Sequence, residues 1–139
     1  MLDRVSAVLY VARAERSTAR MHPMGLKLRK GEKISMKGRN ITVTDTAFEC
    51  LPRVRDRLVE AALARELVTY GELRQELELP YLVQGMGRLL DLLSEDCFRR
   101  NEPSLASIVV NASTGEVGDD FDGDPAAERE RVFDRKHWS

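Results

Sequence analysis

Apolar residues recur at helical spacing through the middle of the chain. The first series predicts an amphipathic helix beginning at Phe48, with Pro52 in its first turn, where proline is tolerated. Shorter and longer series follow over residues 69–79 and 82–98, separated by Pro80, which disfavours helical geometry in the residue before it. The pattern therefore predicts three successive helices. The stripe of the first helix consists of Leu51, Val54, Leu58, Ala61 and Ala62.

The second predicted helix carries a start signal. Thr69 and Glu72 stand three residues apart. This spacing predicts a capping box, in which the Thr69 hydroxyl accepts from the Glu72 amide and the Glu72 carboxylate accepts from the Thr69 amide.

Segments in which apolar and polar residues alternate flank these helices. Three alternating runs, at 26–28, 34–36 and 41–43, have Gly31 and Gly38 in their turns and predict a small antiparallel meander with a basic outer face. Residues 107–110 predict a strand, followed by a turn and a return strand that starts at residue 116. The spacing of residues 2–20 fits a helix, and residues 5–11 fit a strand equally well.

The order helix, short helix, longer helix and hairpin is typical of a winged helix-turn-helix. The expected fold is therefore α+β, as one domain with three parts. These are a basic helix and β segment at 1–47, the winged helix-turn-helix at 48–118, and an acidic tail at 119–139 anchored to the core by Trp138. The predicted core consists of Leu51, Val54, Leu58, Leu73, Leu77, Val83, Met86, Leu90, Ile108 and Val110.

Charge is distributed unevenly along the chain. The net charge is −1, yet residues 1–40 contain ten lysines and arginines against three acidic residues and carry +7, so the rest carries −8. A basic segment on a nearly neutral protein suits a polyanion, because each phosphate contact releases counterions. A solvated basic segment that keeps the chain soluble is the alternative.

The helix-turn-helix segment resembles a known family. Residues 66–73, Glu-Leu-Val-Thr-Tyr-Gly-Glu-Leu, are similar to the opening of the helix-turn-helix in alkylguanine-DNA alkyltransferases and their non-catalytic alkyltransferase-like relatives. Residues 84–90 are similar to that family's recognition stretch. The resemblance covers about residues 48–90 and implies DNA binding. The family's acceptor-cysteine motif would fall at residues 107–111, which hold neither cysteine nor histidine, so alkyl transfer is not expected. Gln84 stands where the family has the arginine that pushes a base out of the duplex.

The flanking segments resemble a different group. Residues 103–118 and 132–138 are similar to a hairpin and a tryptophan-containing tail in small bacterial proteins of unknown role. Those proteins resemble accessory DNA-binding parts of restriction-type or mobile-element systems. The resemblance implies an accessory or regulatory role of this kind.

The expected partner is double-stranded DNA, with the third helix toward the major groove. Thr69 and Tyr70 also have a structural interpretation, as a cap and a packed ring. Arg88, together with Arg99 and Arg100, could equally form a solvated face balanced by acids of the same helix. Packing against a neighbouring helix is the favoured reason for glycine at 85 and 87. The predicted DNA-binding residues are Lys30, Lys33, Lys37, Arg39, Thr69, Tyr70, Gln84 and Arg88.

Other classes of function are disfavoured. The chain shows no nucleophile–base pair and no metal-ligand spacing, so we expect neither an enzyme nor a cofactor. The acidic segment 119–124 lacks the glycine and glutamate positions of a calcium loop. Cys50 and Cys97 predict buried thiols in a reducing compartment, and no apolar run is long enough to span a membrane, so a cytoplasmic location is expected. A protein-interaction adaptor built on the same scaffold is the alternative function.

Overall fold

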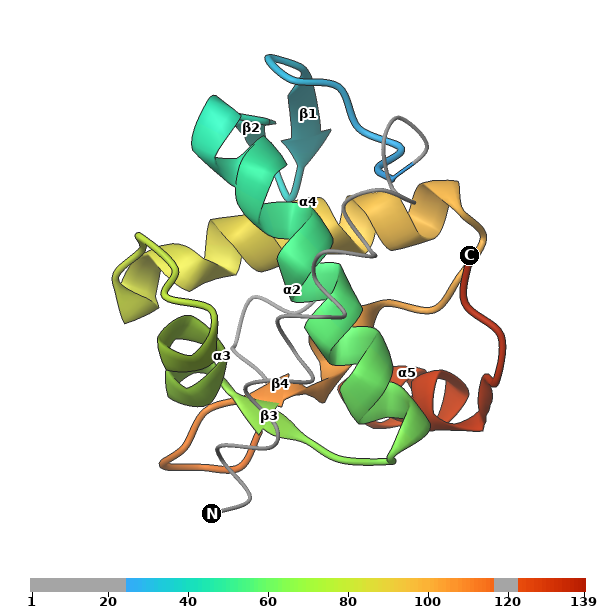
Figure 1. Ribbon diagram of the computed structural model, residues 1–139. Coiled ribbons are helices and arrows are strands. Elements are labelled where there is room, and N and C mark those ends of the chain that lie inside the picture. The colour runs from blue at the N-terminus through green and yellow to red at the C-terminus, as the bar shows by residue number, and fades with distance from the viewer. Residues whose placement is uncertain (1–24, 117–122) are drawn as a thin grey trace.

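A computed structural model describes residues 25–116 and 123–139 (Figure 1). The fold is α+β, as predicted, and the helix or strand predicted within residues 2–20 lies outside the described residues. The elements, in chain order, are β1 (Lys33–Met36), β2 (Arg39–Thr42), α2 (Asp45–Leu63), β3 (Val68–Thr69), α3 (Tyr70–Glu76), the 3-10 helix η1 (Val83–Gly85), α4 (Met86–Arg99), the 3-10 helix η2 (Leu105–Ile108), β4 (Val109–Val110) and α5 (Pro125–Asp134).

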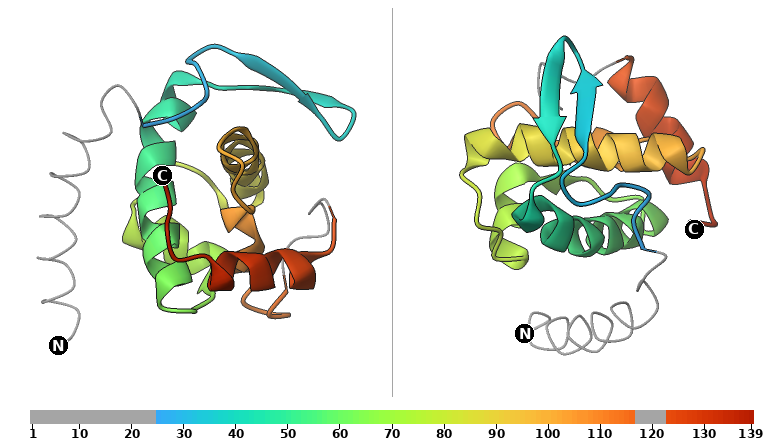
Figure 2. Two further views of the ribbon diagram at one scale, coloured as in Figure 1. Left: turned by 90° about the vertical axis from the view of Figure 1, so that its right-hand side faces the viewer. Right: turned by 90° about the horizontal axis from the view of Figure 1, so that it is seen from above.

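Helix α4 occupies the centre of the fold. Viewed along its axis, it is bordered by α2, by the β1–β2 hairpin and by β4, with α5 beyond β4 (Figure 2). Its inward side carries the buried residues Met86, Leu89, Leu90, Leu92, Leu93 and Cys97. These side chains join those of α2 and η2 in one apolar cluster. The hydrophobic effect that favours the fold is therefore concentrated around this helix.

Helix α2 begins three residues before its predicted start. Thr44 provides the cap, because its hydroxyl accepts a hydrogen bond from the amide of Ala47 at 3.1 Å. Pro52 consequently lies in the helix interior and not in the first turn, so that prediction was wrong. Without an amide proton, Pro52 leaves the main-chain oxygen of Phe48 without its usual helical donor.

The predicted capping box of α3 is confirmed. The amide of Glu72 donates to the Thr69 hydroxyl at 3.0 Å, and the amide of Thr69 donates to the Glu72 carboxylate at 2.9 Å. This reciprocal pair fixes the start of a helix that is only seven residues long.

Nine of the ten predicted core residues are buried, and Val83 is the exception at 50% exposed. The prediction treated residues 82–98 as one α-helix. Residues 83–85 instead form a 3-10 turn, and the regular helix begins at Met86. A 3-10 turn has three residues per turn and not 3.6, so the inward face of α4 does not extend back to Val83.

The strands differ from the prediction. The hairpin has two strands, because the run at 26–28 is not a strand, although Leu28 is buried. The strand predicted at 107–110 is observed only in part: residues 105–108 are 3-10 helix, and β4 pairs in parallel with β3. The return strand predicted from residue 116 lies almost wholly outside the described residues. A turn does follow at 111–116, where the amide of Asn111 donates to the main-chain oxygen of Glu116 at 2.6 Å. Three helices in the predicted order are present, whereas the winged-helix core is not confirmed.

The C-terminal segment is part of the packed structure and contains a helix that the sequence pattern did not reveal. Asp124 caps α5, and Val132 is fully buried. The Glu128 carboxylate accepts a hydrogen bond from the amide of Ser104 at 2.6 Å. Trp138 packs against the core, which confirms its predicted anchoring role.

Replacing Thr69 with alanine should lower the free energy of unfolding by about 1 kcal/mol, because the capping hydrogen bond to the Glu72 amide is lost. Denaturant melts of the wild type and of Thr69→Ala measure this difference. Thr46→Ala, at an exposed position of α2, is the matched control. Equal midpoints for Thr69→Ala and the wild type would show that the cap does not contribute to stability.

Candidate nucleic-acid interface

The β1–β2 hairpin has one buried and one exposed face. Ile34 pairs with Ile41 across the strands, and both side chains are buried. Lys37 and Gly38 form the two-residue turn, with φ of 54° and 75°. Positive φ at both positions is typical of the type I′ turn, whose twist matches that of the strands. Gly38 adopts its positive φ without a steric cost, whereas Lys37 adopts a conformation that L residues with a Cβ rarely take.

Ion pairs attach the turn of the hairpin to α4. The Asp91 carboxylate receives Lys37 Nζ at 3.1 Å and Arg39 Nη2 at 3.4 Å. Asp91 follows Arg88 by about one helical turn. The turn of the hairpin and the N-terminal half of α4 are therefore neighbours.

A second set of contacts attaches the base of the hairpin near the other end of α4. Arg99 Nη2 lies 2.7 Å from the Glu32 carboxylate, and the amide of Lys27 donates to Asp96 at 2.6 Å. The hydrogen bond from Arg99 lowers the pKa of Glu32 to about 2, with further help from the Arg29 amide. The same bond to Glu32 raises the pKa of Arg99. Glu32 and Arg99 thus remain oppositely charged over the whole physiological range.

Three arginines on or just after the third helix were candidates for contact with DNA, and their surroundings in the structure differ. Arg99 also pairs with Glu95, and Arg100 pairs with Asp96 at 2.8 Å. Arg99 matches the balanced-face alternative, whereas the Arg100 side chain is 4% exposed and does not belong to a solvated face. Arg88 is exposed, and it has no ion-pair partner among residues 25–116 and 123–139.

The other predicted contact residues are also on the surface. Lys30 and Lys33 are exposed, and Lys30 Nζ lies 5.5 Å from the centre of the Phe48 ring. Gln84 is exposed on η1, immediately before α4. The predicted contact residues of the hairpin were only its basic ones. The polar side chains of Ser35, Asn40 and Thr42 were not predicted to make contact, although the alternation that places the lysines outward also places these outward.

Thr69 and Tyr70 have structural roles. The Thr69 hydroxyl is used by the capping box, and Tyr70 is partly buried against the core. Their predicted contact with DNA remains a prediction from the resemblance alone.

Packing does not account for the glycines near the start of α4. Among the described residues, a Cβ built on Gly87 would have no atom within 4 Å, and one built on Gly85 would reach only Tyr81 Cδ1 at 3.8 Å. The expectation that a neighbouring helix requires glycine at these positions was wrong.

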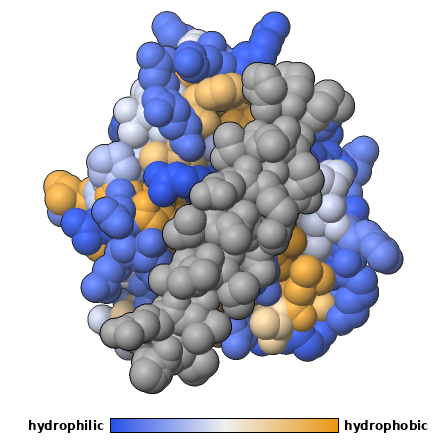
Figure 3. All heavy atoms as spheres, viewed as in Figure 1, coloured by the Kyte–Doolittle hydropathy of each residue, from blue (hydrophilic) through white to orange (hydrophobic). Residues whose placement is uncertain are grey.

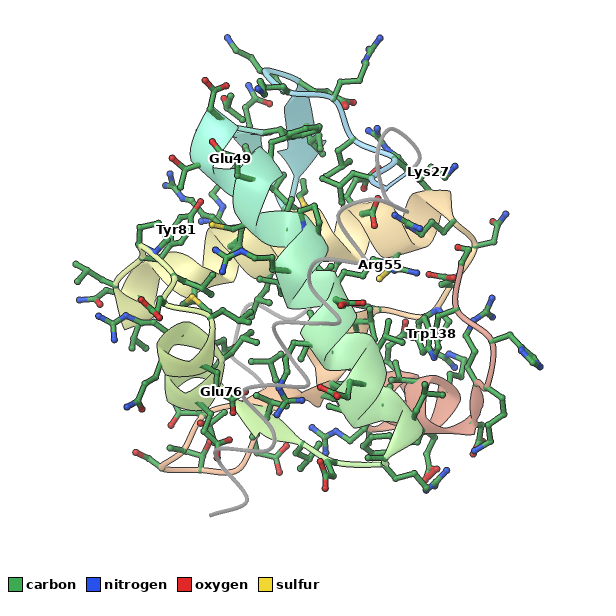
Figure 4. The ribbon with its side chains drawn as sticks, viewed as in Figure 1. Lys27, Glu49, Arg55, Glu76, Tyr81 and Trp138 are labelled. Carbon is green, nitrogen blue, oxygen red and sulfur yellow. The ribbon has the colours of Figure 1, made fainter. Side chains whose placement is uncertain are left out.

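The surface around α3 is acidic. Glu72, Glu76 and Glu78 are all exposed there, and Glu76 pairs with Arg57 at 2.7 Å. Figure 4 shows Glu76 on this side of the molecule, away from the hairpin. Carboxylates repel phosphate, so the surface around α3 is a poor one for a duplex. The basic hairpin is the better candidate.

A buried ion network on the far side of α2 from α3 was not predicted. Arg55 Nη2 donates to Glu102 at 2.8 Å and to the main-chain oxygen of Ser139 at 2.6 Å. Burial alone raises the pKa of Glu102, but hydrogen bonds from Ser139 and the charge of Arg55 outweigh burial and lower it. The Trp138 ring lies 6.0 Å from the Arg55 guanidinium and 5.4 Å from that of Arg135 (Figure 4). This network attaches the C-terminal segment to α2 and α4.

Other kinds of site are not visible in the part of the chain that the structure describes. That part contains no group of three or more metal-ligating side chains and no helix long and apolar enough to cross a membrane. Cys97 is buried, and burial raises the pKa of its thiol to about 11. Because the thiolate is the reactive form, this cysteine is inert at neutral pH.

The chain matches no protein-family model, and no characterised protein or solved structure is found to be similar to it. The resemblance to the alkyltransferase helix-turn-helix thus remains a prediction from the sequence.

Replacing Glu102 with alanine should lower the free energy of unfolding by up to about 3–5 kcal/mol, because it removes the nearer carboxylate from the buried Arg55 charge and leaves only Asp96, at 4.0 Å, to balance it. Denaturant melts measure the loss. Glu95→Ala, which removes a carboxylate from a partly exposed pair with Arg99, should cost far less. Similar losses for the two variants would contradict a special role for the buried network.

The Glu32–Arg99 contact should make stability depend on pH. The pKa of Glu32 is about 2 in the folded chain and 4.5 as its ordinary value. A lowered folded pKa stabilises the fold above about pH 4.5, and this stabilisation is lost as the pH falls through about 2. The difference in unfolding free energy between the wild type and Glu32→Gln should therefore be constant near neutrality and shrink between these values. A difference that does not change across that window would contradict the contact.

Proposed function

We propose that this chain is a non-enzymatic DNA-binding protein, which contacts the duplex with the β1–β2 hairpin and the N-terminal half of α4. One observation carries the proposal. Residues 33–44 contain basic side chains and no acidic one, and they form a hairpin that crosses α4 and projects beyond it (Figure 2). The resemblance noted in the sequence adds the prediction of an accessory role in a restriction-type or mobile-element system.

Local charge supports contact with a polyanion, although the net charge is −1. Lys33, Lys37 and Arg39 belong to the hairpin, and Arg88 belongs to the adjoining turn of α4. The carboxylate of Asp91 lies among these cations. Its ion pairs with Lys37 and Arg39 hold the turn of the hairpin next to the N-terminal half of α4. Phosphate contacts by such a group would supply sequence-independent affinity that falls with salt concentration.

A second function, a protein-interaction adaptor, is favoured by a different surface. Leu82 is 66% exposed and Val83 is 50% exposed, in the segment between α3 and α4. The exposed carboxylate of Glu78 lies close by in the sequence. Apolar side chains beside acids suit a protein partner with a basic rim. In Figure 3, the apolar residues on the part of the surface that is not grey form separate patches.

Charge reversal in the hairpin tests the DNA proposal. Lys30→Glu with Lys33→Glu should weaken binding of all duplexes alike and flatten the salt dependence by about one unit for each lost contact. Fluorescence anisotropy with a labelled duplex at several salt concentrations measures both effects. Lys37 is left unchanged, because a glutamate there would face Asp91 and disturb the hairpin itself.

Lys136→Glu is the matched control, since it makes the same charge change at an exposed position of the C-terminal segment. It should leave the salt dependence nearly unchanged. If the wild type binds no duplex at low salt, the DNA proposal is wrong and the adaptor becomes the leading function. If the control weakens binding as much as the hairpin variant does, the hairpin is not the contact surface.

A further inference from the structure

The outer face of the hairpin has an unusual composition. The strand register places Lys33 opposite Thr42 and Ser35 opposite Asn40, and all four residues are exposed. The same register turns Ile34 and Ile41 to the buried face. The outer face therefore carries hydrogen-bonding side chains, with neither an acid nor a large apolar residue among them.

These side chains are available to a partner. Within the described residues, Lys33, Ser35, Asn40 and Thr42 make no side-chain hydrogen bond and no ion pair. Seen from above, the hairpin lies across α4 and is the layer nearest the viewer (Figure 2, right). A flat surface that approaches from this side meets the hairpin before it meets α4.

The dimensions of the hairpin suit the major groove of a duplex. A two-stranded ribbon fits a groove about 12 Å wide. Side chains two residues apart on a strand are separated by about 6.7 Å, and two base-pair steps span about 6.8 Å. The pairs Lys33–Thr42 and Ser35–Asn40 are one such interval apart. They could thus face base pairs two steps apart without distortion of either molecule.

The chemistry of these residues matches base edges. Lysine donates to guanine O6 and N7, asparagine pairs with adenine N6 and N7, and serine or threonine bonds either donors or acceptors. Cations stand near both ends of the ribbon, with Lys30 at its base and Lys37 and Arg39 at its turn. Cations in those positions suit the phosphates that border the groove.

Helix α4 is less suited to enter the groove. Beyond Arg88, its outer side carries Asp91 and Glu95, which are carboxylates. Before Gln84, the chain presents the exposed apolar side chains of Leu82 and Val83. Only the short stretch from Gln84 to Arg88 has side chains that favour bases.

We propose that the outer face of the β1–β2 hairpin, and not α4, reads the base pairs of a duplex through its major groove. This inference rests on the proposed function. Asn40 and Ser35 are the specificity-determining residues, and Arg88 and the lysines position the duplex through its phosphates.

Selection of duplexes from a random pool, followed by measured affinities, tests the inference. Asn40→Ala should reduce the preference at one base pair by about tenfold or more, which is the range for a bidentate contact. Ser35→Ala should change the preference two steps away. Gln84→Ala and Arg88→Ala should leave the selected sequence unchanged, and Gln75→Ala on the exposed side of α3 is the matched control. Methylation of guanine N7, which blocks the major groove, should interfere with wild-type binding.

The outcomes separate the two proposals. If no duplex binds, the proposed function itself fails. If the wild type binds all duplexes alike, or if Gln84→Ala or Arg88→Ala changes the selected sequence while Asn40→Ala does not, DNA binding stands and the ribbon inference is wrong. Melting curves for each variant show whether a loss of preference reflects a loss of folding.

Discussion

Pairing between carboxylates of α4 and groups from residues 27–39 sets the position of the hairpin. Asp91 holds Lys37 and Arg39 at the turn, and Asp96 accepts the Lys27 amide near the other end. Arg99 adds a pair with Glu32. A two-stranded hairpin alone is marginally stable. Its attachment at both ends, together with the burial of Ile34 and Ile41, gives the basic segment a defined place on the fold.

This attachment has consequences for the surface. The acids of α4 that would repel a duplex are largely used in holding the hairpin, whereas Lys30, Lys33 and Arg88 are exposed. Cationic groups are thus concentrated on one side, and the acids of α3 lie on another. A nearly neutral chain therefore carries a locally basic hairpin, with Asp45 and Glu49 exposed at the start of α2 just after β2.

Local signals made part of the fold predictable. The Thr69–Glu72 capping box depends on residues three apart, and the apolar stripe of α2 on neighbouring turns, so both could be inferred from the sequence. Val83 was wrongly predicted to be in the core, because a 3-10 turn before α4 changes the direction in which its side chain points. The predicted hairpin after α4 is not confirmed: β4 pairs with β3, about forty residues earlier, and no local pattern encodes that pairing. Helix α5 escaped notice because it buries little besides Val132.

The candidate site was predictable in its charges but not in its geometry. The lysines and arginines of residues 27–39 identified a basic segment, and alternation placed their side chains outward. Lys37 Nζ lies 3.1 Å from the Asp91 carboxylate, although the two residues are 54 positions apart in the sequence. The network of Arg55 and Glu102 is equally non-local, at 47 positions. Long-range ion pairs leave no periodic signal, which is why both were missed.

Amide chemical shifts during titration with a duplex test the central claim most directly, since they map contact residue by residue. The proposed interface predicts that the largest shifts fall on residues 33–42 and on the start of α4, with little change in α3 and α5. Shifts confined to α3 and to residues 78–83, with an unchanged hairpin, would contradict it.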